Sequence, residues 1–164
     1  MRITAPGQPA RRTAFELQAG SVPSVNAVAN GELIASAAAV LKPHSVDDRL
    51  FGDVGSTLVT VAGNHYSGVC IDTGSGTGFC AEHAAIAAMV TAGEYRIARI
   101  VAVWRDPADR LHVVPPCGRC REFIRQIDPA NMDTEVVTGP DAVVSLRELL
   151  PLSDWPAPLD PPAG

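Results

Sequence analysis

The stretch VPPCGRCRE, residues 114–122, carries two cysteines three positions apart behind a pair of prolines. Such a pair can be a redox dithiol, half of a structural zinc site, or two ligands of a catalytic metal. The three interpretations imply three different classes of protein. The rest of the chain has to decide among them.

Composition and charge exclude several classes of protein. The chain has 164 residues, 46% hydrophobic and 19% charged, which is typical of one globular domain with a sizeable core. A formal net charge of −5 argues against a nucleic-acid partner. No apolar run approaches membrane-spanning length, and no hydrophobic stretch follows the arginines near the start. We therefore expect a cytoplasmic protein whose cysteines stay reduced.

The distribution of proline and glycine predicts three regions. Residues 1–22 are rich in Pro, Gly, Ala and Arg and are expected to form a flexible extension. Residues 154–164 form a Pro-rich tail that cannot build regular structure. The folded, functional domain is expected between them, at residues 23–153.

Hydrophobic periodicity predicts the element order α-β-β-α-β-α-β-α in this domain, in which a short strand ending at residue 114 is not counted. The expected helices are 24–41, 81–92, 117–127 and 145–150, and the expected strands are 54–61, 66–71, 97–104, a short strand ending at 114, and 135–138. A hairpin followed by crossover helices implies an α/β fold with a mixed sheet covered by helices on both faces. Alanines on nearly every side of helix 81–92 predict that it is buried all round.

Three cysteines fall at the starts of the two crossover helices. Cys80 lies where a glycine-rich loop ends and helix 81–92 begins, and Cys117 and Cys120 open the next helix. Both helices follow strands, so the three thiols can meet at one edge of the sheet. The amides and the positive dipole end of a helix stabilise a thiolate there. Three thiolates around Zn²⁺ leave a fourth position for water, which is the pattern of a catalytic site.

Glu82 follows Cys80 by two positions, close enough to reach a water held at such a site. A zinc-bound water has a pKa of about 7, and a neighbouring carboxylate can accept its proton. A carboxylate in this place has no evident structural purpose. We therefore expect Glu82 to be the catalytic acid and base.

Cys80-Ala81-Glu82 followed by PCGRCRE at residues 116–122 resembles the zinc-dependent cytidine deaminase superfamily. A cysteine as first ligand is similar to the small nucleoside-type branch, which includes cytidine deaminase and blasticidin S deaminase. The resemblance covers residues 54–151 and includes YSGV at 66–69 and RELLP at 147–151. It implies a three-layer α/β/α sandwich with a mixed, roughly five-stranded sheet.

The same resemblance implies a function and an assembly. Zn²⁺ would be held by Cys80, Cys117 and Cys120, and Glu82 would shuttle protons. The implied reaction is hydrolytic deamination of a cytosine-type nucleoside or nucleoside analogue, with another aminated heterocycle as the alternative. The implied substrate is a small molecule, not nucleic acid, and the implied assembly is a homo-oligomer, most simply a tetramer.

Several positions depart from the family pattern. Cys70 and Asp72 stand where related enzymes carry the asparagine and glutamate that hold the ribose. By the resemblance, these two residues and Ala81 contact the substrate, and plain cytidine is expected to be a poor substrate. His83 replaces the arginine that follows the glutamate, and is expected to support the metal site from the core. Arg121 is expected to brace a thiolate or carboxylate near the metal, or to form a surface salt bridge.

Two non-enzymatic interpretations remain open at this stage. A dithiol redox protein would use Cys117 and Cys120, but it leaves Cys80 and Glu82 unexplained. A structural zinc site would recruit Cys70 as a fourth thiolate, since four cysteines are what such a site needs.

Overall fold

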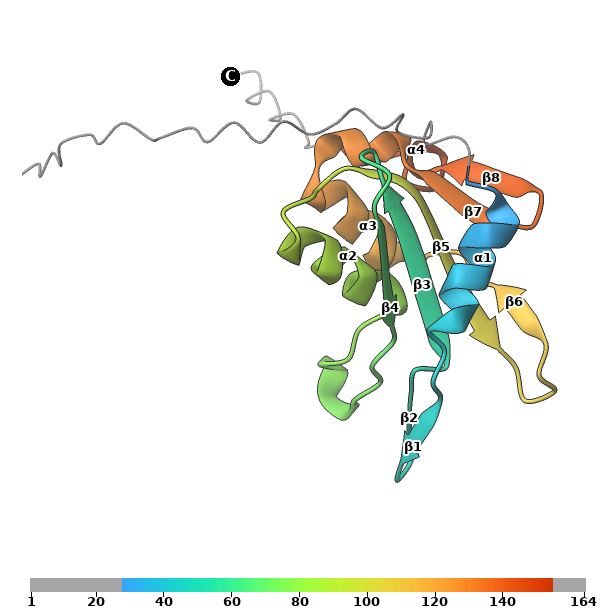
Figure 1. Cartoon of the computed structure of the whole chain (residues 1–164). Helices are drawn as coiled ribbons and strands as arrows, with labels where there is room; N and C mark the ends of the chain where they lie inside the picture. Colours follow the sequence, from blue (N-terminus) through green and yellow to red (C-terminus); the bar gives the residue numbers. More distant parts are fainter. Residues whose placement is uncertain (1–27, 155–164) are drawn as a thin grey trace, which may run out of the picture.

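The computed structural model describes residues 28–154, which form an α/β fold around a mixed central sheet (Figure 1). The helices are α1 (Asn30–Ala39), α2 (Ala81–Thr91), α3 (Gly118–Ile127) and α4 (Leu146–Leu149), with short 3-10 helices η2 (Gly74–Gly76) and η3 (Pro129–Asp133). The strands are β1 (His44–Val46), β2 (Arg49–Phe51), β3 (Val54–Thr60), β4 (His65–Val69), β5 (Ile97–Arg105), β6 (Leu111–Val113), β7 (Glu135–Gly139) and β8 (Ala142–Ser145). The predicted extension at 1–22 and all but the first residue of the predicted tail lie outside the described residues. Within 28–154, no helix is both long and apolar enough to cross a bilayer.

The sheet has the order β4-β3-β5-β7-β8, and β6 pairs with the end of β5. β3 is antiparallel to both β4 and β5, whereas β5 and β7 run parallel. A parallel pair requires a crossover connection, which α3 supplies between β5 and β7. The predicted mixed sheet is confirmed, with six strands rather than five. The additional strand is β8, which forms a hairpin with β7 that the sequence did not reveal.

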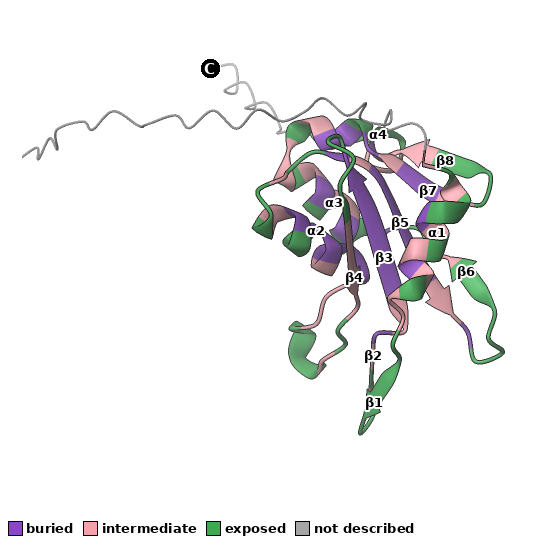
Figure 2. Cartoon of the chain, in the orientation of Figure 1, coloured by how far each residue is buried: buried purple, intermediate pink, exposed green. Residues whose placement is uncertain are grey.

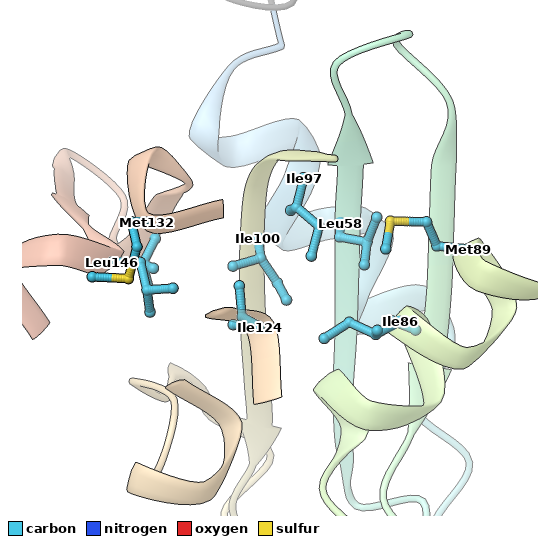
Figure 3. Packing of buried hydrophobic residues seen from close by; sticks show 10 residues of the cluster. Leu58, Ile86, Met89, Ile97, Ile100, Ile124, Met132 and Leu146 are labelled. Atoms are coloured by element: carbon cyan, nitrogen blue, oxygen red, sulfur yellow. The ribbon is translucent and has the colours of Figure 1, made fainter. Parts of the chain in front are cut away.

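The two faces of the sheet carry separate hydrophobic clusters. Leu58, Ile100 and Val136 pack against α2, α3 and α4, whereas their neighbours Val59, Val101 and Val137 pack against α1. Adjacent strand residues point to opposite faces, so a strand covered on both sides must be apolar at successive positions. Figure 2 shows β3 and β5 buried along most of their length, and Figure 3 shows the larger cluster. The predicted three-layer arrangement is thereby confirmed.

The N-terminal part of the described chain differs from the prediction in two ways. The first helix begins at Asn30, not at Ser24, and residues 24–27 lie outside the described range. The Asn30 side chain donates to the carbonyl of Pro140 at 2.9 Å and accepts from Arg99. It therefore anchors the start of α1 to the turn between β7 and β8 and to β5. Residues 44–51, for which no strand was predicted, form the β1–β2 hairpin, which projects past the end of the sheet (Figure 1).

Helix α2 is buried on one side only within a single chain. Ala81, Ala85, Ile86 and Met89 are fully buried, but Ala87 and the following Ala88 are exposed. The prediction that this helix is buried all round is therefore wrong for the isolated chain. Its small side chains leave an apolar strip on the surface, visible as exposed residues on α2 in Figure 2.

Helix α2 approaches β4 so closely that only glycine fits between them. A Cβ atom on Gly68 would lie 2.4 Å from the Ala84 Cβ and 2.6 Å from the Ala85 backbone nitrogen. Real Cβ contacts are never this short, so any side chain at position 68 would push the helix away from the sheet. Gly68 therefore sets the distance between α2 and the sheet, and with it the position of Cys80 and Glu82.

We expect Gly68→Ala to lower the free energy of unfolding by about 1–3 kcal/mol, the usual cost of overpacking a core. The measurement is urea denaturation followed by circular dichroism. Gly31→Ala is the matched control, because a Cβ there meets nothing within 4 Å. It should be neutral or stabilise α1 by up to about 1 kcal/mol. Equal effects of the two substitutions would contradict the close packing of α2 on β4.

Candidate active site

The starts of α2 and α3 bring three cysteine sulfurs together. Cys80 is the N-cap residue of α2, Cys117 is the N-cap residue of α3, and Cys120 lies in the first turn of α3. The Cys80 and Cys117 sulfurs are 3.7 Å apart, and the Cys117 and Cys120 sulfurs are 3.5 Å apart. All three Sγ atoms lie within 4.8 Å of one another. The predicted convergence of residues 37 positions apart is confirmed.

These distances suit a tetrahedral metal. A zinc–sulfur bond of about 2.3 Å places two sulfurs of a tetrahedron about 3.8 Å apart, close to the observed separations. Cys120 is fully buried and Cys117 is exposed, so the triangle has a protein side and an open side. The cluster is of the kind typical of zinc binding in cytidine deaminases. The donor set therefore fits Zn²⁺ with one further coordination position.

The electrostatics of the thiols favour a bound cation. Burial raises the pKa of Cys117, but the Cys120 and Arg119 amides and the neighbouring thiols lower it by more, so its pKa lies below the ordinary value. Burial, and then the negative charge of Glu82, raise the pKa of Cys120, and burial also raises the pKa of Cys80. Without a cation, the three sulfurs cannot all be ionised so close together. A dication removes that repulsion, and its binding releases protons.

Glu82 is buried beside this cluster. Its side chain comes from the first turn of α2, and the residue is 5% exposed. Burial raises the pKa of Glu82, and the nearby Cys120 thiol opposes the shift only in part. A carboxylate with a raised pKa can both accept and return a proton near neutral pH. The location predicted for Glu82 agrees with the structure.

His83 and Arg121 have surroundings different from those expected. His83 is 7% exposed, packs edge-to-face on Phe123 at a centroid distance of 4.4 Å, and its buried Nε2 has no hydrogen-bond partner among residues 28–154. It is a core residue, as expected, but within the described part of the chain no hydrogen bond from Nε2 links it to the cysteines. Arg121 donates to the carbonyls of Pro116 at 2.8 Å and Leu149 at 3.1 Å. It therefore orients the segment before Cys117, and among residues 28–154 it contacts neither a thiolate nor a carboxylate.

A pocket of about 330 Å³ opens next to Cys80. Its lining residues are Cys70, Ile71, Asp72, Thr73, Gly76, Gly78, Phe79, Cys80 and Arg119. Most come from the loop after β4, which two hydrogen bonds between Ile71 and Phe79 close at its neck. The structure thus places Cys70 and Asp72 in the lining of the pocket that borders Cys80. Ala81, the third expected contact, is fully buried and is not part of this lining.

Arg119 is a pocket residue that the sequence analysis missed. Its guanidinium donates to the Gly78 carbonyl at 3.1 Å and so ties α3 to the loop. Its place between two cysteines in the first turn of a helix was the available signal. Asp53 was also missed, because it precedes β3 without any motif around it. Its carboxylate accepts a hydrogen bond from Cys70 at 3.0 Å.

Cys70 is not part of the group of sulfurs that could hold a metal, which among residues 28–154 comprises the other three cysteines alone. All four cysteines are free thiols. The structure therefore favours neither a fourth thiolate from Cys70 nor an isolated dithiol, because Cys80 completes a triangle with the other two.

A three-thiolate cluster with an open side, a buried carboxylate and an adjoining pocket together define the class of hydrolytic zinc enzymes. Comparison with known proteins narrows the class. The chain is 36% identical over 104 residues to blasticidin-S deaminase of Bacillus cereus, covering 60% of this chain and 74% of that protein. It is 33% identical over 103 residues to cytidine deaminase of Halalkalibacterium halodurans, with the same coverage. No protein-family model matches the sequence.

Solved structures agree with the sequence relatives. A variant of cytidine deaminase from Mycobacterium tuberculosis matches with a TM-score of 0.65 and 25% identity, over 78% of this chain and 99% of that one. Cytidine deaminase from Burkholderia pseudomallei matches with a TM-score of 0.63 and 28% identity, over 77% and 100%. The chain belongs to the cytidine deaminase and blasticidin-S deaminase family and is an aminohydrolase of that family.

We expect the purified protein to contain about one zinc ion per chain by elemental analysis. Cys120→Ala should lose the metal, because the remaining two thiolates form an incomplete site. Cys70→Ala is the matched control and should retain it, since the Cys70 thiol bonds to Asp53 instead. Loss of zinc from Cys70→Ala would restore the interpretation of a four-cysteine structural site.

Proposed function

We propose that residues 23–153 catalyse the hydrolytic deamination of a cytosine-type nucleoside or nucleoside analogue, with release of ammonia. The observation that carries this proposal is the buried Glu82 carboxylate beside three convergent thiols, next to a pocket of about 330 Å³. Zn²⁺ held by Cys80, Cys117 and Cys120 would supply an activated water at the open side of the cluster. Glu82 and the pocket residues carry the rest of the chemistry.

Glu82 acts as the proton carrier. Its carboxylate accepts a proton from the attacking water and delivers it to the ring nitrogen next to the amine-bearing carbon. The second proton of the water goes to the departing amine, which leaves as ammonia, and the water oxygen remains as the new carbonyl. Burial, which raises the pKa of Glu82, keeps both protonation states accessible during this sequence.

The acidic chain favours a free nucleoside over a nucleic acid, because polyanion binding needs a basic surface. Two sequence relatives are named for cytidine and for blasticidin S, which supports a cytosine-type base with a variable sugar. Cys70 and Asp72 line the pocket where a sugar would lie, and neither can replace the amide of asparagine as a hydrogen-bond donor. Another aminated heterocycle is the alternative substrate. We expect the enzyme to act in the cytoplasm, where thiols stay reduced.

Glu82→Gln should retain zinc and lose at least about a hundredfold in turnover, because general acid–base catalysis contributes about 10²–10⁴-fold. The assay is ammonia release across cytosine nucleosides, cytosine, blasticidin S and aminopurines. The control is Glu122→Gln, since Glu122 pairs with Arg125 on the exposed side of α3 and should be dispensable. Wild-type turnover in Glu82→Gln, or no deamination by the wild type, would sink the assignment.

The exposed strip of α2 supports a second proposal, that the chain forms a homo-oligomer and most simply a tetramer. The strip continues into an apolar pocket of about 280 Å³ lined by Phe79, His83, Ala87, Arg119 and Phe123. Phe123 is 36% exposed at this place. A second copy would cover this apolar surface.

Light scattering at micromolar concentration should give a mass several times that of one chain. Ala87→Glu should shift the mass toward the monomer by placing a charge on the strip. Ala35→Glu is the matched control, because Ala35 is an exposed alanine on α1, on the opposite face of the sheet. A wild-type monomer would refute the proposed assembly.

A further inference from the structure

Cys70 lines the candidate substrate pocket, and its thiol is paired with Asp53, which lies outside the pocket lining. Asp53 directly precedes β3 and Cys70 directly follows β4, so the pairing of these strands brings the two side chains together. The Cys70 thiol donates to Oδ1 of Asp53 at 3.0 Å, and the Val54 amide donates to the Cys70 sulfur at 3.4 Å. Both the hydrogen and one lone pair of the thiol are thereby used.

The backbone around this pair holds it in place. Gly52 donates from its amide to the Cys70 carbonyl at 3.1 Å, and Cys70 donates from its amide to the Val54 carbonyl at 3.0 Å. Gly52 has a φ of +69°, and a Cβ there would lie 2.6 Å from the Lys42 carbonyl oxygen. The segment before β3 is thus locked against the end of β4. The thiol cannot turn toward the pocket without breaking its bond to Asp53.

The surface that Cys70 presents to the pocket is consequently apolar. Burial, and then the hydrogen bond to Asp53, raise the pKa of Cys70, so the thiol stays protonated at neutral pH. A sulfur whose proton is engaged offers a ligand hydroxyl no donor and only a weak acceptor. Asp72 is exposed at the same pocket and can only accept hydrogen bonds. A hydroxyl pressed against Cys70 would therefore exchange its hydrogen bonds to water for at best a weak one to the sulfur.

We propose that Asp53 is a specificity-determining residue, which by holding the Cys70 thiol selects nucleosides whose sugar carries no hydroxyl where it meets Cys70. The preferred substrate class is thus a deoxy or dideoxy cytosine nucleoside, or an analogue whose sugar is similarly reduced. The inference rests on the proposed deaminase function. It concerns the sugar alone and leaves the chemistry at Glu82 unchanged.

The test compares kcat/KM for cytidine, 2′-deoxycytidine, 3′-deoxycytidine and 2′,3′-dideoxycytidine with the zinc-loaded enzyme. The wild type should prefer at least one deoxynucleoside over cytidine by about five- to tenfold, the size expected for one unmade hydrogen bond. Asp53→Ala should reduce that preference about threefold or more, because the released thiol can donate to the sugar. Asp53→Asn should preserve it, because the amide oxygen still accepts from Cys70.

Two further variants secure the interpretation. Cys70→Asn supplies a donor and should turn the preference toward cytidine, which tests the idea from the other partner if Asp53→Ala does not fold. Asp141→Ala removes an exposed aspartate in the turn between β7 and β8 and should leave the preference unchanged. An effect of Asp141→Ala equal to that of Asp53→Ala would mean that general charge, not the pair, sets the preference, and would overturn the proposal.

The hydrogen bond itself can be tested without activity. Asp53 raises the pKa of Cys70, so Asp53→Ala should lower that pKa and speed alkylation of Cys70 by iodoacetamide at about pH 8, as followed by peptide mass mapping. Unchanged alkylation, or a wild type that handles cytidine best and is indifferent to Asp53→Ala, would overturn the specificity proposal while leaving deamination intact. A wild type that deaminates no cytosine nucleoside would overturn the proposed function and this inference with it.

Discussion

The close contact between α2 and β4 at Gly68 is the constraint on which the site depends. The missing side chain lets the helix axis approach the sheet, and the first turn of α2 then reaches the level at which α3 begins. The two helix starts meet because β4 and β5 are both antiparallel to β3 and so end on the same side of the sheet, where α2 follows β4 and α3 follows the β5–β6 hairpin. Backbone packing therefore brings the three ligand positions together. The sequence has only to place cysteines at the N-caps of α2 and α3 and in the first turn of α3.

Charge and burial act in opposite directions at this edge. Burial of Cys120 and Glu82 raises the pKa values of both groups, which disfavours the anions that the chemistry needs. Backbone amides at the start of α3 favour the thiolate of Cys117. A bound dication would offset the effect of burial on the thiols, because it stabilises the sulfur anions. Glu82 would then be the group with an exchangeable proton.

The sequence predicted the structure best at positions where the chemistry of the site restricts the choice of residue. The cysteines, Glu82 and the glycine-rich loop predicted the paired helix starts, and the long apolar runs predicted a sheet buried on both faces. Local patterns failed where distant contacts decide. Asn30 begins α1 because it bonds across the sheet to Pro140, a contact 110 positions away. Arg121 has a backbone carbonyl of Leu149 as a partner, and no side-chain pattern could reveal that. The Asp53–Cys70 pair depends on the register of β3 and β4, which the separate strands do not specify.

The two hydrogen bonds between Ile71 and Phe79 also separate the loop that lines the pocket from the cysteines that would hold the metal. They close the loop at its neck, so residues 72–77 can change in sequence or length while Phe79 and Cys80 keep their positions. Gly78 is the exception, because a Cβ there would lie 2.4 Å from the Ile71 carbonyl oxygen. Tolerance to insertion is a general property of loops whose ends are held together. Sequence variation is thus confined to the loop that lines the pocket. Substrate preference can therefore change while the cysteines and Glu82 keep their positions.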